Sequence, residues 1–183
     1  MRIVVGLGNP GTEYARTRHN VGFRLLDLLA GDGNWTQKFE GEFLKDGELL
    51  LARPLTYMNE SGRFVGPLAK YFKVQPKDVL VVYDEIALPL GRLRMRPDGS
   101  AGGQNGMKSV IAHLGTDKVP RLRIGIGPQP AGMPSEVYVL KPFSKEQESI
   151  LPDVLERAAG AVKLWLSDGI EAAMNQVNRD PAA

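Results

Sequence analysis

The 183-residue chain contains no cysteine and only two histidines. The missing cysteine excludes disulfide bonds, thiolate metal sites and a cysteine nucleophile. Apolar runs are too short for a signal peptide or a membrane span, and the first ten residues lead directly into a glycine turn. No serine lies in a G-x-S-x-G motif, so a serine nucleophile lacks a supporting context. We therefore expect a soluble, cytoplasmic protein.

The sequence also lacks repeats, low-complexity segments and Pro/Ser-rich linkers, so we expect residues 1–183 to form a single domain. Hydrophobic residues make up 43% of the chain and charged residues 24%, as in globular proteins with a sizeable core. Short apolar runs bounded by turn signals alternate with helical patterns. This order predicts an α/β fold with a mixed sheet and helices on both faces.

Period-2 and period-3.6 patterns locate the expected elements. Strands are predicted at residues 2–7, in a hairpin at 43–52, and at 78–83, 92–96 and 121–124. Helices are predicted at 21–30, 61–72, 104–114, 144–166 and 168–177. The first helix is expected to bury Val21, Leu25, Leu28 and Leu29. Pro67 could kink or break the second helix, and Asp168 is the expected cap of the last one.

Basic residues are concentrated between positions 92 and 123, where seven of them accompany two acidic residues for a net charge of +5. The whole chain carries only +2. Such a segment is compatible with a polyanionic partner, and also with a strand edge whose charges prevent aggregation. Because side chains alternate along a strand, Arg94 and Arg96 share one face, as do Arg121 and Arg123. This alternation allows the arginine side chains to form a basic surface.

Residues 6–11, GLGNPG, match the G-x-G-x-x-G pattern of dinucleotide-binding turns directly after the first predicted strand. However, Pro10 removes one backbone amide, and the next apolar helix begins only near residue 20. We expect instead a tight turn that exposes Asn9 at the carboxyl end of the sheet, where open α/β sheets place their sites. We expect no cofactor, and NAD(P) or FAD binding is the weaker alternative.

His19 precedes the first predicted helix, near the positive end of its dipole, which favours a neutral imidazole that can accept a proton. Asn20 is a plausible N-cap, and a turn histidine without chemistry is the alternative. Asp84 ends the predicted strand 78–83, where it could orient a histidine across the crevice or cap the next turn. Neighbours on a strand point to opposite faces, so Asp84 and Glu85 are not expected to share a centre. Without metal-ligand spacing elsewhere, we expect no metal.

Asn59 and Asn105 lie where the segments 56–62 and 99–106 enter predicted helices. Each could be an ordinary cap or turn residue, although Ser61 could take the capping role from Asn59. Together with His19, Asp84 and Asn9, they suit hydrolysis by water, with a histidine base, an aspartate behind it and amides for carbonyl and oxyanion oxygens. Such a reaction needs no metal and no covalent intermediate.

Six stretches make the sequence resemble the bacterial-type peptidyl-tRNA hydrolase family. They are VGLGNPG at 5–11 with Tyr14, TRHNVG at 17–22, TYMNESG at 56–62, DE at 84–85 with PLG at 89–91, GGQNG at 102–106, and RLRIGIG at 121–127. They occur in the family's order across almost the whole chain.

The resemblance implies a monomeric enzyme with an α/β/α sandwich that cleaves the ester between a peptide and tRNA. By resemblance, His19 is the general base, Asp84 orients it, and Asn9 helps to distinguish N-blocked from free aminoacyl esters. The remaining positions implied to contact the substrate or the tRNA acceptor end and its phosphates are Asn59, Asn105, Tyr14, Tyr57, Arg96 and Arg123.

Three features depart from the family's pattern. Gln104 stands where the family often has histidine, Ala87 where aspartate is common, and RPD at 96–98 replaces a more glycine-rich, lysine-bearing stretch. They affect the expected tRNA contacts rather than the hydrolytic core. Plant-organelle splicing factors resemble the same family and bind RNA without hydrolysis, so a non-catalytic RNA-binding protein is the alternative. The presence of His19, Asp84 and the three asparagines favours the enzyme.

Overall fold

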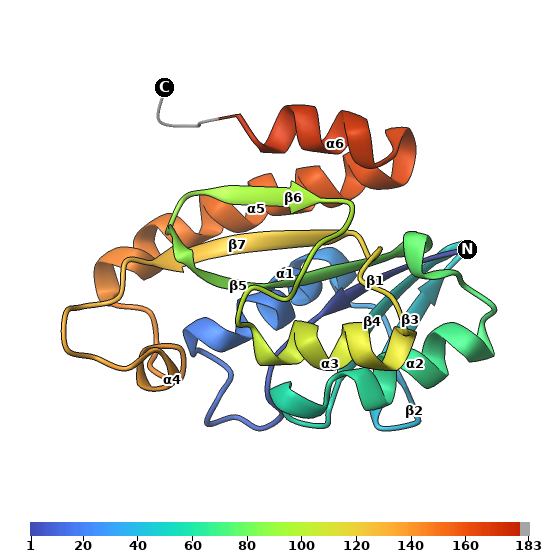
Figure 1. The fold of residues 1–183 in the computed structure, drawn as a ribbon, viewed down its shortest axis with the longest axis horizontal. Coiled ribbons are helices and arrows are strands. Elements are labelled where there is room, and N and C mark those ends of the chain that lie inside the picture. Colours follow the sequence, from blue (N-terminus) through green and yellow to red (C-terminus); the bar gives the residue numbers. More distant parts are fainter. Residues whose placement is uncertain (180–183) are drawn as a thin grey trace.

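The computed structural model describes residues 1–179, whose ribbon is drawn in Figure 1. The strands are β1 (Arg2–Gly6), β2 (Thr36–Lys38), β3 (Gly41–Asp46), β4 (Leu49–Pro54), β5 (Val79–Pro89), β6 (Leu93–Arg96) and β7 (Arg121–Gly127). The helices are α1 (Val21–Ala30), α2 (Gly62–Tyr71), α3 (Asn105–Leu114), α4 (Ser135–Tyr138), α5 (Lys145–Asp168) and α6 (Ile170–Val177). A short 3-10 turn, η1 (Arg18–Asn20), leads into α1. Within this part of the chain, no helix has the length and apolar character that a membrane crossing requires.

In the described residues, seven strands form one sheet in the order β2-β3-β4-β1-β5-β7-β6. The four central strands β4, β1, β5 and β7 run parallel to one another. At one edge, β3 pairs antiparallel with both β2 and β4, and at the other edge β6 pairs antiparallel with β7. The sheet is therefore mixed, and β3 with β4 forms the hairpin predicted at 43–52.

Helices cover both faces of this sheet, which confirms the predicted α/β architecture (Figure 1). The cores show α1 and α5 packed on one face and α2 and α3 on the other. Alternate residues of the central strands supply the two cores: Val4 and Leu80 face α1 and α5, whereas Val5 and Val81 face α2 and α3. Strands buried on both faces read as continuous apolar runs, which is why β1 and β5 are visible in the sequence.

Two expectations about the helices are wrong. Leu28 is 44% exposed rather than in the core, because the buried stripe of α1 passes through Leu25 and Leu26 instead. Asp168 is the last residue of α5, and Gly169 with a φ of 91° occupies the N-cap position of α6. A glycine adopts this backbone conformation at low cost, so the chain turns there without a side-chain cap. Pro67 neither breaks nor ends α2, which runs through it.

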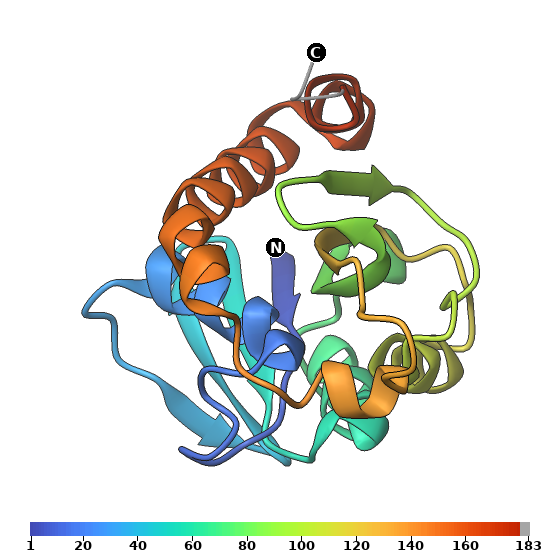
Figure 2. The same cartoon turned by 90° about the vertical axis from the view of Figure 1, so that its left-hand side faces the viewer.

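The site is positioned by the point at which β1 leaves the sheet. The pairing of β1 with β5 ends at Gly6 opposite Val82, whereas β5 continues beside β7 to Pro89. The expectation that Asp84 ends its strand is therefore wrong, because β5 continues to Pro89. Asp84 lies two residues beyond Val82, the last residue of β5 that pairs with β1. This end of the sheet, where α4 lies beside the segment before α1, faces the viewer in Figure 2. Crevices at the carboxyl ends of parallel strands are the usual sites of α/β proteins.

Candidate active site

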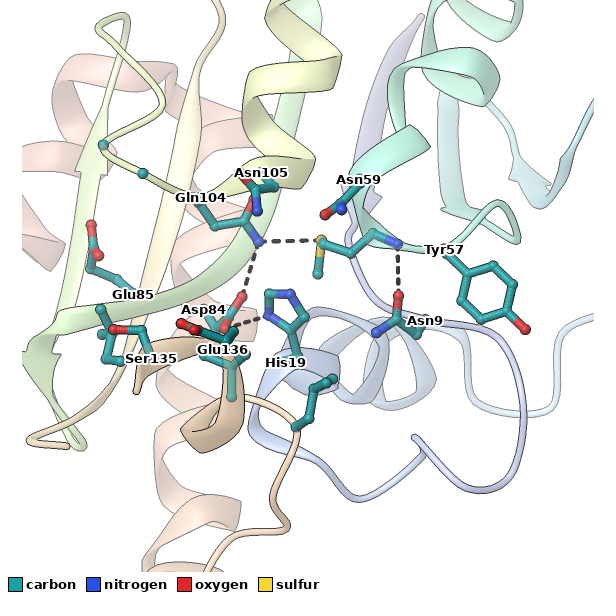
Figure 3. A pocket seen from close by; sticks show the side chains of 16 residues that line it. Asn9, His19, Tyr57, Asn59, Asp84, Glu85, Gln104, Asn105, Ser135 and Glu136 are labelled. Carbon is teal, nitrogen blue, oxygen red and sulfur yellow. Dashed lines mark hydrogen bonds and ion pairs between the residues drawn. The ribbon is translucent and has the colours of Figure 1, made fainter. Parts of the chain in front are cut away.

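A cleft of about 580 Å³ opens at this end of the sheet. Its walls come from the turn after β1, η1, the segment before α2, β5, the entry to α3, and α4. The polar side chains that line it are Asn9, His19, Tyr57, Asn59, Asp84, Glu85, Gln104, Asn105, Ser135 and Glu136, most of them visible in Figure 3. His19, Asp84 and the three asparagines singled out in the sequence thus share one cleft.

His19 and Asp84 form the closest contact between titratable groups in the cleft. His19 Nδ1 lies 2.7 Å from Asp84 Oδ2, with side chains 14% and 2% exposed. An ionised carboxylate only accepts hydrogen bonds, so the Nδ1 proton belongs to this contact and Nε2 is the nitrogen available to a ligand. The backbone N–H of His19 donates to the Val139 carbonyl at 2.9 Å, which fixes the residue from the opposite side. The pair has the geometry of an oriented general base.

Gln104 is the second hydrogen-bond partner of the Asp84 carboxylate. Its Nε2 donates to Asp84 Oδ1 at 3.1 Å and lies 3.2 Å from the sulfur of Met58, as drawn in Figure 3. Its Oε1 accepts from the backbone N–H of Met107 at 2.7 Å and so caps α3. The cap prevents the side-chain amide from flipping, because a flip would place a donor against the Met107 N–H. The expectation that Gln104 lies outside the hydrolytic core is therefore wrong, because its side chain binds the Asp84 carboxylate and no local signal in the sequence indicated that contact.

Asn9 is held with its amide nitrogen free for a ligand. Its Oδ1 accepts from the backbone N–H of Met58 at 2.6 Å, which leaves the Nδ2 hydrogens as donors beside the cleft. Asn20 braces the same turn, because its side chain accepts from the Asn9 N–H and donates to the Asn9 carbonyl, both at 2.9 Å. Asn20 occupies the N-cap position of α1 but makes no capping hydrogen bond, so the expected capping role is wrong.

Asn59 and Asn105 both line the cleft with exposed side chains. Neither is needed as a helix cap: the first N–H of α2 is capped by Ser109 Oγ of α3 at 2.9 Å, and Gln104 caps α3. Asn105 is the first residue of α3. The two amides are therefore available to a bound substrate.

Tyr57 stands at the rim of the cleft in a strained backbone conformation. Its φ is 69°, and its side chain is 55% exposed. A positive φ is costly for an aromatic residue, and such strain gathers at functional sites. Tyr14 does not line the cleft, but its ring packs edge-on against Tyr57 with centroids 6.2 Å apart. The two rings form one aromatic surface beside Asn9.

The expected basic surface is only partly correct. Cross-strand pairing places Arg94 opposite Arg123 and Arg96 opposite Arg121, so all four start from one face of β6 and β7. Arg121, however, is 2% exposed, because its guanidinium is enclosed by the backbone of Ser100, Asp117 and Val119. Its guanidinium donates to the carbonyls of Val119, Ser100 and Asp117 at 2.8–3.0 Å. Arg121 therefore supports the loop before α3 and does not face a ligand.

Arg96 is exposed and Arg123 is half-buried, and neither lines the cleft. Arg123 Nη1 donates to Glu85 Oε1 at 3.1 Å, whereas the adjacent Asp84 contacts His19. The two carboxylates thus serve different partners, as their alternation along β5 predicted. Beneath them, burial raises the pKa of the Tyr83 hydroxyl, against the opposing influence of the Arg121 and Arg123 charges.

One wall of the cleft was not found from the sequence. Ser135, Glu136, Val139 and Leu140 belong to α4 and the turn after it, a segment between Pro134 and Pro142 that is too short for a periodic pattern. Within residues 1–179, no three His, Asp or Glu side chains gather in a group that could hold a metal ion.

Comparison with known proteins gives consistent results over the full chain. The family profile described as peptidyl-tRNA hydrolase matches residues 3–183. The peptidyl-tRNA hydrolases of Desulfitobacterium hafniense and Elusimicrobium minutum are 49% and 47% identical, with 98% of this chain and 100% of each relative covered. The crystal structure of the enzyme from Acinetobacter baumannii superposes with a TM-score of 0.90 at 34% identity, covering 100% of this chain and 97% of that one. On these matches, the chain belongs to the peptidyl-tRNA hydrolase family.

Proposed function

We propose that the chain hydrolyses the ester bond of peptidyl-tRNA, with His19 as the general base and water as the nucleophile. Membership of the family supports the activity and its product, free tRNA. The 2.7 Å contact between His19 and Asp84, in a cleft lined by three asparagines, supports the assignment of the base. Asp84 is the residue that orients it.

The reaction requires one proton to move twice. His19 Nε2 takes a proton from water while the water oxygen attacks the ester carbonyl carbon, and Asp84 stabilises the resulting imidazolium. The carbonyl oxygen becomes an oxyanion. When the bond to the ribose oxygen breaks, the imidazolium returns its proton to that oxygen, releasing tRNA and a peptide with a free carboxyl group. The base is then neutral again.

The asparagines supply amide donors for the substrate's oxygens. Asn9 can only donate into the cleft, because its oxygen is bound to the Met58 N–H. Its Nδ2 is suited to the peptide carbonyl that precedes the ester, a group that a free aminoacyl ester lacks. Asn59 and Asn105 lie on two other walls and position the remaining oxygens. A donor held in place before the reaction stabilises developing charge without reorganisation.

The tRNA part of the substrate extends beyond the cleft. Tyr14 and Tyr57 form an aromatic surface for the acceptor end, where a terminal base can stack. Arg96 and Arg123 bind the nearby phosphates. As the resemblance to the family implies, we also propose that the enzyme acts as a monomer.

The decisive experiment follows the release of tRNA from an N-blocked aminoacyl-tRNA. His19→Ala is expected to lower kcat by about 10²–10⁴-fold, the usual scale for loss of a general base. His113→Ala is the matched control, because this second histidine lies on α3 outside the cleft and its ring nitrogen Nδ1 lies 2.9 Å from the Ser109 carbonyl. Activity is expected to survive EDTA. Near-normal turnover by a folded His19→Ala variant would remove the mechanism, and RNA binding without hydrolysis by the unaltered chain would favour a non-catalytic RNA-binding protein.

A further inference from the structure

Arg18, the residue before the proposed base, is a buried cation that has no carboxylate partner among the described residues. Arg18 is only 7% exposed, and within residues 1–179 its guanidinium forms no ion pair. Its Nε is buried without a hydrogen-bond partner. Arginine is rarely buried unless it is paired, and an uncompensated buried charge is costly. A position that keeps such a side chain requires a physical reason.

The guanidinium of Arg18 holds the segment that follows α4. Its Nη1 donates to the Tyr138 carbonyl at 3.2 Å and reaches the Lys141 carbonyl at 3.5 Å. Its Nη2 donates to Gln147 Oε1 at 2.8 Å, in the first turn of α5. The charge lies 3.9 Å from the centre of the Tyr138 ring, and the Tyr138 hydroxyl is itself bound to the Ile126 carbonyl of β7. One side chain thus connects η1, the end of α4 and the start of α5.

The backbone of the same residues forms a short ladder. The Arg18 N–H donates to the Lys141 carbonyl at 3.1 Å, the His19 N–H donates to the Val139 carbonyl at 2.9 Å, and Thr17 bridges to Pro142. Val139 belongs to the cleft wall that faces His19. His19 is therefore held between Asp84 on its ring and this wall on its backbone.

We propose that Arg18 is a positioning residue, which sets the place of His19 relative to the wall formed by α4 and the turn after it. When the Arg18 guanidinium no longer binds its three acceptors, the backbone ladder opens. The distance between His19 and the wall formed by α4 and the turn after it is then no longer fixed. Displacements of about 1 Å in a catalytic group can cost on the order of 10²-fold in rate. This inference rests on the proposed role of His19 as the base.

The test compares Arg18→Met and Arg18→Lys with Arg24→Met. Methionine keeps the apolar stem beside Tyr138 and removes every donor, whereas lysine keeps the charge but cannot bind acceptors on both sides. Arg24 is the matched control: it also joins the N-terminal half to α5, through two hydrogen bonds to Glu148 at 2.7 and 3.0 Å, without contacting the α4 wall. Measurements are the melting temperature, kcat and KM on N-blocked aminoacyl-tRNA, and amide exchange of residues 18 and 19.

Arg18→Met is expected to lower kcat by about 10- to 100-fold with a smaller change in KM, since tRNA contacts lie elsewhere. Amide exchange at Arg18 and His19 is expected to accelerate by about tenfold or more, because these two N–H groups make the ladder. Arg18→Lys should show the same changes to a lesser degree, and it carries the test if Arg18→Met does not fold. Arg24→Met should leave both exchange rates and kcat within about twofold of the unaltered chain while lowering the melting temperature.

Unchanged exchange at residues 18 and 19 in a folded Arg18 variant would overturn the inference. Faster exchange with unchanged kcat would overturn it too, because the ladder would then open without affecting catalysis. Equal losses of kcat in the Arg18 and Arg24 variants would reveal a general stability effect and refute the positioning role. A failure of the proposed function is recognised separately, by the absence of hydrolysis in the unaltered chain.

Discussion

Replacing Asp84 by asparagine exchanges one acceptor oxygen of the carboxylate for an amide NH₂ group, which only donates hydrogen bonds. Both oxygens now accept: Oδ2 from His19 Nδ1 at 2.7 Å and Oδ1 from Gln104 Nε2 at 3.1 Å. An amide at position 84 can satisfy only one of these donors. Gln104 cannot turn its own amide around, because its oxygen caps α3 through the Met107 N–H. The new amide NH₂ group at position 84 must therefore face either the NH₂ group of Gln104 or the ring of His19.

Each of the two arrangements lowers kcat. If the amide oxygen of the new asparagine faces His19, its NH₂ group points at the NH₂ group of Gln104. Two donors then face each other at a position where the Asp84 side chain is only 2% exposed. A buried donor without an acceptor costs about 1–3 kcal/mol. If the amide NH₂ group of the new asparagine faces His19, Nδ1 must accept its hydrogen bond. The ring proton then lies on Nε2, the nitrogen that is needed as the base. Because the competent arrangement is less stable by about 1–3 kcal/mol, kcat of Asp84→Asn should fall roughly 5- to 150-fold. This loss is smaller than that expected for His19→Ala.

The double variant Asp84→Asn with Gln104→Glu tests the argument directly. A glutamate at 104 can accept hydrogen bonds both from the Met107 N–H and from the amide NH₂ group of the asparagine at 84. The amide oxygen of that asparagine is then free to accept the Nδ1 proton of His19. Single-turnover release of tRNA should therefore be faster in the double variant than in Asp84→Asn. Gln104→Glu alone places two carboxylates in contact and should be impaired. If the double variant is no faster than Asp84→Asn, the tautomer argument is wrong.

Three further predictions concern selectivity, tRNA affinity and stability. Asn9→Ala should narrow the preference for N-blocked over free aminoacyl-tRNA, by the roughly 0.5–1.5 kcal/mol of one hydrogen bond; an unchanged ratio of kcat/KM between the two substrates would contradict this role. Arg96→Ala or Arg123→Ala should flatten the slope of log affinity against log salt by about one unit and leave a short N-blocked aminoacyl-nucleotide fragment unaffected, whereas equal losses on both substrates would refute the phosphate contact. The hydrogen bond from Arg24 lowers the pKa of Glu148 from its usual 4.5, so the pair stabilises the fold above pH 4.5 and loses that contribution as the pH falls through the lowered pKa. Urea unfolding should thus show Glu148→Gln less stable at neutral pH, with the difference shrinking in acid; a difference that grows in acid would contradict the assignment.

The sequence by itself determined the fold class and most of the elements. β1 and β5 are apolar runs because both of their faces are covered by helices. The predicted start of a helix at residue 144 agrees with α5, whose N-terminus is closed by a capping box of Ser144 and Gln147. Asn9 and Asp84 stood out because they follow the apolar runs of two predicted strands, and His19 because it precedes the first predicted helix. Local physics suffices for such features, since secondary-structure period and turn chemistry act between residues that are close along the chain.

Only the tertiary structure decided which of these side chains touch, and which arginines reach solvent. His19 and Asp84 meet across 65 positions, and Gln104 joins them from a third segment. Arg96 and Arg121 are direct cross-strand neighbours with the same alternation, yet one is exposed and the other is 2% exposed. Alternation fixes the face on which a side chain stands, but a distant loop determines whether that face is covered. For the same reason Arg18 could not be recognised as buried, because the carbonyls and the ring that surround it lie about 120 residues further along the chain.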